Sequence, residues 1–156
     1  MSLYKTYFER PGKLFALLID PEFHTHESLE RTIHEAEVAD IDMLLIGGSL
    51  VSQSLEATLE KIGQLTQKPR IIFPGNLMQL SNNAEGILFI SLISGRNPDL
   101  LIGNHVLSSQ YLKKSGLEVI PTGYILIESG STTSVEYISN TRAIPANKPD
   151  IIVSTA

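Results

Sequence analysis

The chain alternates short apolar runs with longer segments in which apolar and polar residues are mixed. Residues 14–19 form an uninterrupted apolar run, and further runs occupy 43–46, 71–73, 86–92 and 119–127. Short apolar runs that end in Gly, Pro, Asn or Ser are typical of strands buried on both faces, as in a parallel sheet covered by helices. We therefore expect five strands in this order.

The segments between these runs show helical spacing. Leu29, Ile33 and Ala36 recur at i, i+4 and i+7, which predicts an amphipathic helix with Thr25 as its N-cap. A second helix is expected over 55–65, where leucines and an isoleucine recur in the same way.

A third helix is expected to start after Asn97, which is a good N-cap, with Pro98 in the first helical position. Its apolar face would consist of Ile102, Val106 and Leu112. The Ser/Thr-rich stretch that follows the fifth strand predicts a loop over the strand ends. The last apolar residues, 151–156, are typical of the start of a further helix.

Composition narrows the class of protein. The chain has 156 residues, 42% apolar and 19% charged, which suits one globular domain over 1–156. Its net charge of −5 argues against non-specific nucleic-acid binding, and the absence of Cys excludes disulfides and thiolate metal sites. No apolar run reaches the length of a membrane span, and the N-terminal residues 1–5 lack the apolar core of a signal peptide. A cytoplasmic protein without an integral membrane segment is therefore expected.

Small and polar residues follow four of the predicted strands. Asp20, 47–49, 75–76 and 94–97 would meet at one edge of a parallel sheet, where α/β proteins bind ligands. Glycines let a phosphate approach backbone N–H groups, and Asp and Ser oxygens suit Mg²⁺. The pattern predicts a phosphate or diphosphate site with a divalent metal. The metal ligands would be Asp20 and Ser49, and the phosphate contacts Gly47, Gly48, Asn76 and Arg96.

Each of these signals also has a purely structural interpretation. Gly47-Gly48-Ser49 is compatible with a simple turn, and Asp20 before Pro21 with a turn or cap residue. Arg96 is equally compatible with a structural loop contact. No pairing of Ser, His and Asp indicates a nucleophile, so no catalytic residue is assigned.

These positions resemble the geranylgeranylglyceryl phosphate synthase family, which includes the heptaprenylglyceryl phosphate synthases. The resemblance implies a TIM-type (β/α)₈ barrel that joins a polyprenyl diphosphate, with geranylgeranyl expected, to sn-glycerol 1-phosphate in ether phospholipid biosynthesis. It also implies Mg²⁺ as cofactor, with Asp20 and Ser49 at the family's metal-binding positions. The similar stretches are Leu18-Ile19-Asp20-Pro21, Ile46-Gly47-Gly48-Ser49, Phe73-Pro74-Gly75-Asn76, Ser94-Gly95-Arg96-Asn97-Pro98 and the segment 121–128.

The chain departs from that pattern in two respects. Phe23 and His24 stand where the family commonly has a basic residue. About five βα units are visible, whereas a full barrel takes roughly 200 to 250 residues, so we expect the N-terminal part of a barrel. The alternative is a flavodoxin-like doubly wound sheet, for which this length is normal.

Three functions follow from these alternatives. The first is the prenyltransferase that the resemblance implies. The second is another phosphate-binding α/β enzyme of the isomerase or aldolase type. The third is an inactive barrel fragment that acts only in assembly. Because an open barrel leaves its outer strands unpaired, we also expect a homo-oligomer.

Overall fold

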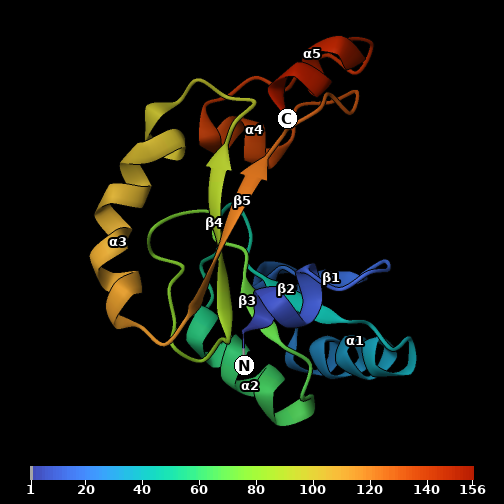
Figure 1. Cartoon of the computed structure of the whole chain (residues 1–156). Coiled ribbons are helices and arrows are strands. Elements are labelled where there is room, and N and C mark those ends of the chain that lie inside the picture. Colours follow the sequence, from blue (N-terminus) through green and yellow to red (C-terminus); the bar gives the residue numbers. More distant parts are fainter. Residues whose placement is uncertain (1) are drawn as a thin grey trace. The chain divides into compact units, whose positions relative to one another are not determined.

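The computed structural model describes residues 2–156, and the chain forms two compact units (Figure 1). The first unit comprises the residues up to Leu88 together with Ser115–Ile120. The second comprises Phe89–Lys114 and Pro121–Ala156. The expectation of a single domain over 1–156 stays a prediction.

The first unit is built on three short parallel strands: β1 (Ala16–Ile19), β2 (Met43–Ile46) and β3 (Arg70–Ile72). Ile19 pairs with Ile46, and Ile46 pairs with Ile72. All three isoleucines are fully buried. Because they are the last residues of their strands, the three carboxyl ends stop level with one another.

Helices α1 (His26–Val38) and α2 (Leu55–Leu65) follow β1 and β2. Thr25 and Ser28 form a capping box at the start of α1, and Ser54 caps α2. The predicted apolar residues of α1 are buried, as are Leu55, Leu59 and Ile62 of α2. Two short helical turns complete this part, η1 (Tyr4–Phe8) and η2 (Pro21–Phe23).

The second unit contains the last part of β4 (Gly86–Leu92) and of β5 (Glu118–Tyr124). Between them lie a π-helical turn, η3 (Asp99–Gly103), and the helix α3 (Asn104–Lys114). Two helices follow, α4 (Ser134–Ser139) and α5 (Pro149–Thr155). The core of this unit consists of Leu92, Leu126 and Ala143, against which Leu100, Tyr124 and Val135 pack.

Strand order decides between the two expected architectures. The sheet runs β1-β2-β3-β4-β5, and β1 with β2, β2 with β3, and β3 with β4 pair in parallel. In a flavodoxin-like sheet β1 would lie between β2 and β3. Here β2 lies between β1 and β3, so the flavodoxin-like alternative is wrong. Each strand is placed beside its predecessor, which is the winding of a TIM-type barrel.

The first strand is shorter and more exposed than predicted. It begins at Ala16, and the side chains of Phe15 and Leu18 are 58% and 47% exposed, so burial on both faces is wrong. β1 is an edge strand, and successive side chains of a strand point to opposite faces. Ile19 faces the core, whereas Leu18 points to the other side.

The predicted apolar face of the third helix is also wrong in part. Leu112 is buried, but Ile102 and Val106 are 62% and 64% exposed. The helix starts with the wider π turn η3, which shifts the angular position of the residues that follow from regular α spacing. The predicted loop after the fifth strand contains α4, whose capping box joins Thr133 and Glu136.

Candidate functional site

The carboxylate of Asp20 lies where β1 leaves the sheet. Pro21 follows it, and Asp20 has the extended conformation expected before a proline. Its Oδ1 accepts a hydrogen bond from the Glu22 N–H at 3.1 Å. Its Oδ2 faces Gly48, where an added Cβ would lie only 2.3 Å away. The carboxylate therefore rests on the backbone of the loop after β2, next to Ser49.

Three glycines allow the loops after β2 and β3 to meet. Gly47 has a φ of +148° and donates from its N–H to the Ile19 carbonyl at 3.0 Å. A Cβ on Gly47 would lie 2.1 Å from the Phe73 carbonyl oxygen, and one on Gly75 would lie 2.2 Å from the Gly48 carbonyl oxygen. The glycines that were predicted to contact a phosphate are therefore required for the close packing of the two loop backbones.

A buried amide ties these two loops together. The side chain of Gln79 is 3% exposed, and its Nε2 donates to the Gly48 carbonyl at 2.7 Å. Its Oε1 accepts from the N–H groups of Gly75 at 3.1 Å and Gly48 at 3.4 Å. Gln79 was not predicted as a site residue, and nothing in its local sequence marks it.

A second carboxylate fixes the far side of the loop after β2. Glu22 accepts hydrogen bonds from the backbone N–H of Gln53 at 2.8 Å, and from the backbone and hydroxyl of Ser52. The N–H groups of Gln53 and Ser52 hold the pKa of Glu22 below its usual value. The turn that carries Asp20 is therefore fastened to the loop that carries Ser49.

The chemistry of this cluster fits a hard divalent cation. Asp20 Oδ2 and the Ser49 hydroxyl accept no hydrogen bond from residues 2–156, and both side chains are partly exposed. Carboxylate and hydroxyl oxygens are suitable Mg²⁺ ligands. Within the part of the chain that the structure describes, no three His, Asp or Glu side chains gather in a metal-binding group.

Asn76 lies beside this cluster in a turn. Its Oδ1 accepts from the Met78 N–H at 2.8 Å, which closes an Asx turn. Asn76 therefore has a structural role in its own turn. The side-chain amide remains a donor, and its contact with a phosphate stays a prediction.

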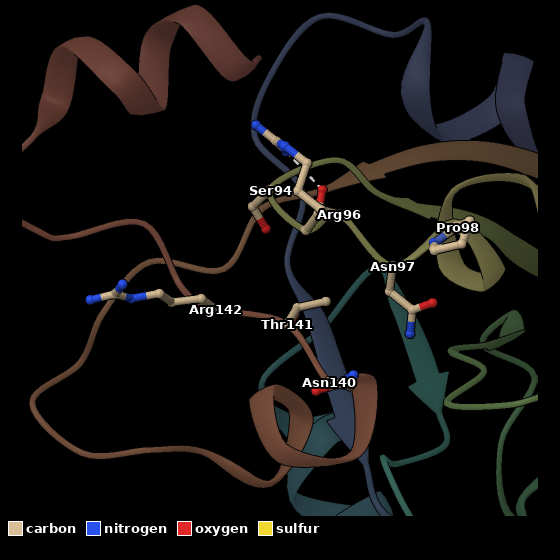
Figure 2. A pocket seen from close by; sticks show the side chains of 8 residues that line it. Ser94, Arg96, Asn97, Pro98, Asn140, Thr141 and Arg142 are labelled. Atoms are coloured by element: carbon tan, nitrogen blue, oxygen red, sulfur yellow. Dashed lines mark hydrogen bonds between the residues drawn. The ribbon is translucent and has the colours of Figure 1, made fainter.

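Arg96 lies in the second unit, in a pocket of about 350 Å³ between the loops 94–98 and 140–142 (Figure 2). Its Nη1 donates to the Gly95 carbonyl at 2.7 Å. Asn97 joins the two loops because its Nδ2 donates to the Ser139 carbonyl at 2.8 Å. Arg142, which was not predicted as a site residue, lines the same pocket.

The structure thus brings Asp20, Gly47, Gly48 and Ser49 together with the turn of Asn76. Arg96 belongs to the other unit, and the convergence of all four loops stays a prediction. The lysines that an aldolase-type site would need do not follow the strands of the first unit. Lys61 of α2 pairs with Glu30, and Lys68 pairs with Asp40.

A sequentially wound parallel sheet with small and acidic residues at the carboxyl ends of its strands defines an α/β protein of the TIM-barrel type. Comparison with known proteins makes this specific. The PcrB family model matches residues 8–156, and the chain belongs to this family.

Curated relatives include a geranylgeranylglyceryl phosphate synthase from Chitinophaga pinensis, which is 44% identical over 99% of the chain and 63% of that protein. The synthase of the same name from Spirosoma linguale is 40% identical over 100% of the chain and 63% of its own length. The synthase from Methanosphaera stadtmanae is 37% identical over 92% of the chain. The chain therefore spans less than two thirds of the length of these relatives.

Solved structures agree with the fold. The structure of GGGPS from Thermoplasma volcanium superposes with a TM-score of 0.89 at 26% identity, over 99% of this chain and 63% of that one. The (S)-3-O-geranylgeranylglyceryl phosphate synthase from Thermoplasma acidophilum, in complex with its substrate sn-glycerol-1-phosphate, gives 0.90 at 28% identity over 100% of this chain and 64% of that one. None of the helices in residues 2–156 is long and apolar enough to cross a membrane.

Proposed function

We propose that the chain provides the metal and diphosphate site of a prenyltransferase that joins a polyprenyl diphosphate to sn-glycerol 1-phosphate. The observation that supports this most is the close packing of the Asp20 carboxylate against Gly48, the residue before Ser49. The names of the relatives and the glycerol phosphate bound in the Thermoplasma acidophilum protein support the substrate pair. Geranylgeranyl is the proposed prenyl chain, and the product is a precursor of ether phospholipids.

The surroundings of Asp20 suit a ligand with an anionic head and an apolar tail. The loops after β1, β2 and β3 each expose a large apolar side chain: Phe23 is 82%, Leu50 70% and Met78 90% exposed. Exposed apolar side chains gathered at one edge of a sheet are typical of a binding surface. An isoprenoid chain would find apolar contacts there beside the metal site.

In the proposed reaction the oxygen of the glycerol hydroxyl forms a C–O bond to the allylic carbon, and the C–O bond to the diphosphate breaks. The diphosphate leaves with the bonding electron pair, and the proton of the hydroxyl passes to solvent. Asp20 and Ser49 would hold Mg²⁺, with Gly47, Gly48 and Asn76 as further phosphate contacts in the same unit. The contact of Arg96 with a phosphate stays a prediction. Mg²⁺, when bound, supplies positive charge that stabilises the leaving diphosphate. Glu22 and Gln79 keep the two loops in place around it.

Binding of labelled geranylgeranyl diphosphate, measured by equilibrium dialysis with Mg²⁺ and with EDTA, tests this proposal. We expect Mg²⁺ to tighten binding in the wild-type chain, and Asp20→Asn to remove that gain because the amide has lost the negative charge. Asp150→Asn is the matched control, since this exposed residue lies in α5 of the second unit.

Unchanged Mg²⁺-dependent affinity in Asp20→Asn would contradict the metal role of this carboxylate. A correctly folded wild-type chain that binds no prenyl diphosphate would favour the assembly-only alternative. Preference for a short phosphorylated sugar over the prenyl diphosphate would favour an isomerase or aldolase.

A further inference from the structure

The pocket in the second unit contains two arginines without an acidic partner. Within residues 2–156 the side chains of Arg10, Arg31 and Arg70 form ion pairs with Asp or Glu, whereas Arg96 and Arg142 form none. Figure 2 shows that these two side chains leave different loops and extend toward the same side of the view. Two exposed guanidinium groups therefore extend from the loops that line one pocket, and neither forms an ion pair with a carboxylate.

Packing fixes the loops from which both arginines extend. Gly95 leaves no space for a side chain, because an added Cβ would lie 2.6 Å from Thr141 Cγ2. The Thr141 and Ser139 hydroxyls lie 2.6 Å apart, and Asn97 donates to the Ser139 carbonyl. The backbones that carry Arg96 and Arg142 are thus held together before any ligand binds.

Other donors of the pocket remain available. The Ser94 hydroxyl oxygen accepts from the Leu126 N–H at 2.9 Å, which leaves its own hydrogen free to donate. Arg96 uses one N–H for the Gly95 carbonyl and retains the others. The nearby carboxylate of Glu136 accepts from Thr133 and from the Ala143 N–H, and these bonds lower its pKa. The Glu136 carboxylate therefore accepts hydrogen bonds from Thr133 and Ala143 and forms no ion pair with either arginine.

From this arrangement we infer that Arg142 and Arg96, with the Ser94 hydroxyl, form a phosphate-binding site that requires no metal ion. Guanidinium groups bind phosphate oxygens through paired charge-assisted hydrogen bonds, and they stay protonated at every physiological pH. The inference rests on the proposed function only for the source of the phosphate, which is the prenyl diphosphate or the glycerol phosphate. Arg142 is the residue that it adds to the site.

Inorganic pyrophosphate is the probe, titrated calorimetrically into the full chain in EDTA at low ionic strength. We expect Arg142→Gln to weaken binding about tenfold, as the loss of one charge-assisted pair would do. Arg142→Lys should lie between wild type and Arg142→Gln, because it keeps the charge but not the fork of donors. Arg31→Gln on the exposed face of α1 is the matched control for net charge and should leave affinity unchanged.

Two results would overturn the inference: no pyrophosphate binding to the wild-type chain in EDTA, or equal losses in Arg142→Gln and Arg31→Gln. If only geranylgeranyl diphosphate displaces the bound pyrophosphate, the site binds the diphosphate of the prenyl substrate. If only sn-glycerol 1-phosphate displaces it, the site binds the phosphate of the glycerol substrate. Because the assay contains no metal, Asp20→Asn should bind pyrophosphate as wild type does. Failure of the metal proposal and failure of this one therefore remain distinguishable.

Discussion

At the scale of single residues, the most informative contact is that between the Asp20 carboxylate and Gly48. The position of a strand end could be inferred from sequence, because an apolar run followed by Asp-Pro marks it locally. The need for a glycine at position 48, against which the Asp20 carboxylate packs, could not be inferred, because Asp20 and Gly48 follow different strands. Only the folded register of β1 and β2 brings them together.

Gly48→Ala should therefore impair metal binding more than folding. The new Cβ would lie 2.3 Å from Asp20 Oδ2 and must push the carboxylate aside. We expect at least about tenfold weaker Mg²⁺ affinity, the equivalent of about 1.4 kcal/mol, in a calorimetric titration.

The control is Gly116→Ala, since nothing lies within 4 Å of a Cβ added to that glycine and its φ is ordinary. Equal Mg²⁺ affinities of the two alanine variants would show that the carboxylate is not held against the loop after β2.

At the scale of elements, features that depend on neighbouring residues in the sequence could be predicted, whereas contacts between segments far apart in the sequence could not. The helix α1 was predicted with its buried face and its Thr25 cap, and α2 with its buried residues Leu55, Leu59 and Ile62, because spacing and capping are properties of a short window. The last predicted apolar residue of α2, Leu65, is 38% exposed. The π turn η3 interrupts that regularity, so Ile102 and Val106 were assigned to the wrong face. Gln79 was missed because its partner Gly48 lies 31 residues away along the chain.

Gln79→Leu should reduce the stability of the first unit substantially. The substitution leaves the Gly48 carbonyl and the Gly75 N–H without their partner in a buried setting. We expect a loss of about 3 kcal/mol in the free energy of unfolding, measured by urea denaturation.

Gln64→Leu makes the same chemical change on the exposed side of α2 and should alter stability by no more than about 0.5 kcal/mol. A loss below about 1 kcal/mol in Gln79→Leu would mean that water replaces the amide at both backbone groups.

At the scale of the whole molecule, strand order was the decisive feature. Sequence patterning gave the βα alternation but left open a flavodoxin-like sheet, because both architectures share the same alternation of elements. The pairing of β2 with both β1 and β3 removes that ambiguity. The expected homo-oligomer stays a prediction, and the exposed side chains of the edge strand offer a way to test it.

Phe15→Lys combined with Leu18→Lys should shift the chain toward the monomer. These side chains are exposed at and beside the edge strand β1, and charged residues on an edge oppose pairing with another chain. Sedimentation velocity should show wild-type species larger than the 17.1 kDa monomer and a smaller species in the double variant.

Val38→Lys, which changes an exposed residue at the end of helix α1 and touches neither edge strand, tests whether any added charge has this effect. A wild-type chain that sediments as a monomer would contradict the prediction outright.

The bridge made by Gln79 has a mechanical consequence. Because one amide holds the Gly48 carbonyl and the Gly75 N–H, a displacement of the loop after β2 is transmitted to the loop after β3. The two loops respond as a coupled pair, and a cation bound at Asp20 would be sensed at Gly75 without touching it. The NMR signal of the Gly75 amide would therefore report whether the cation site at Asp20 is occupied.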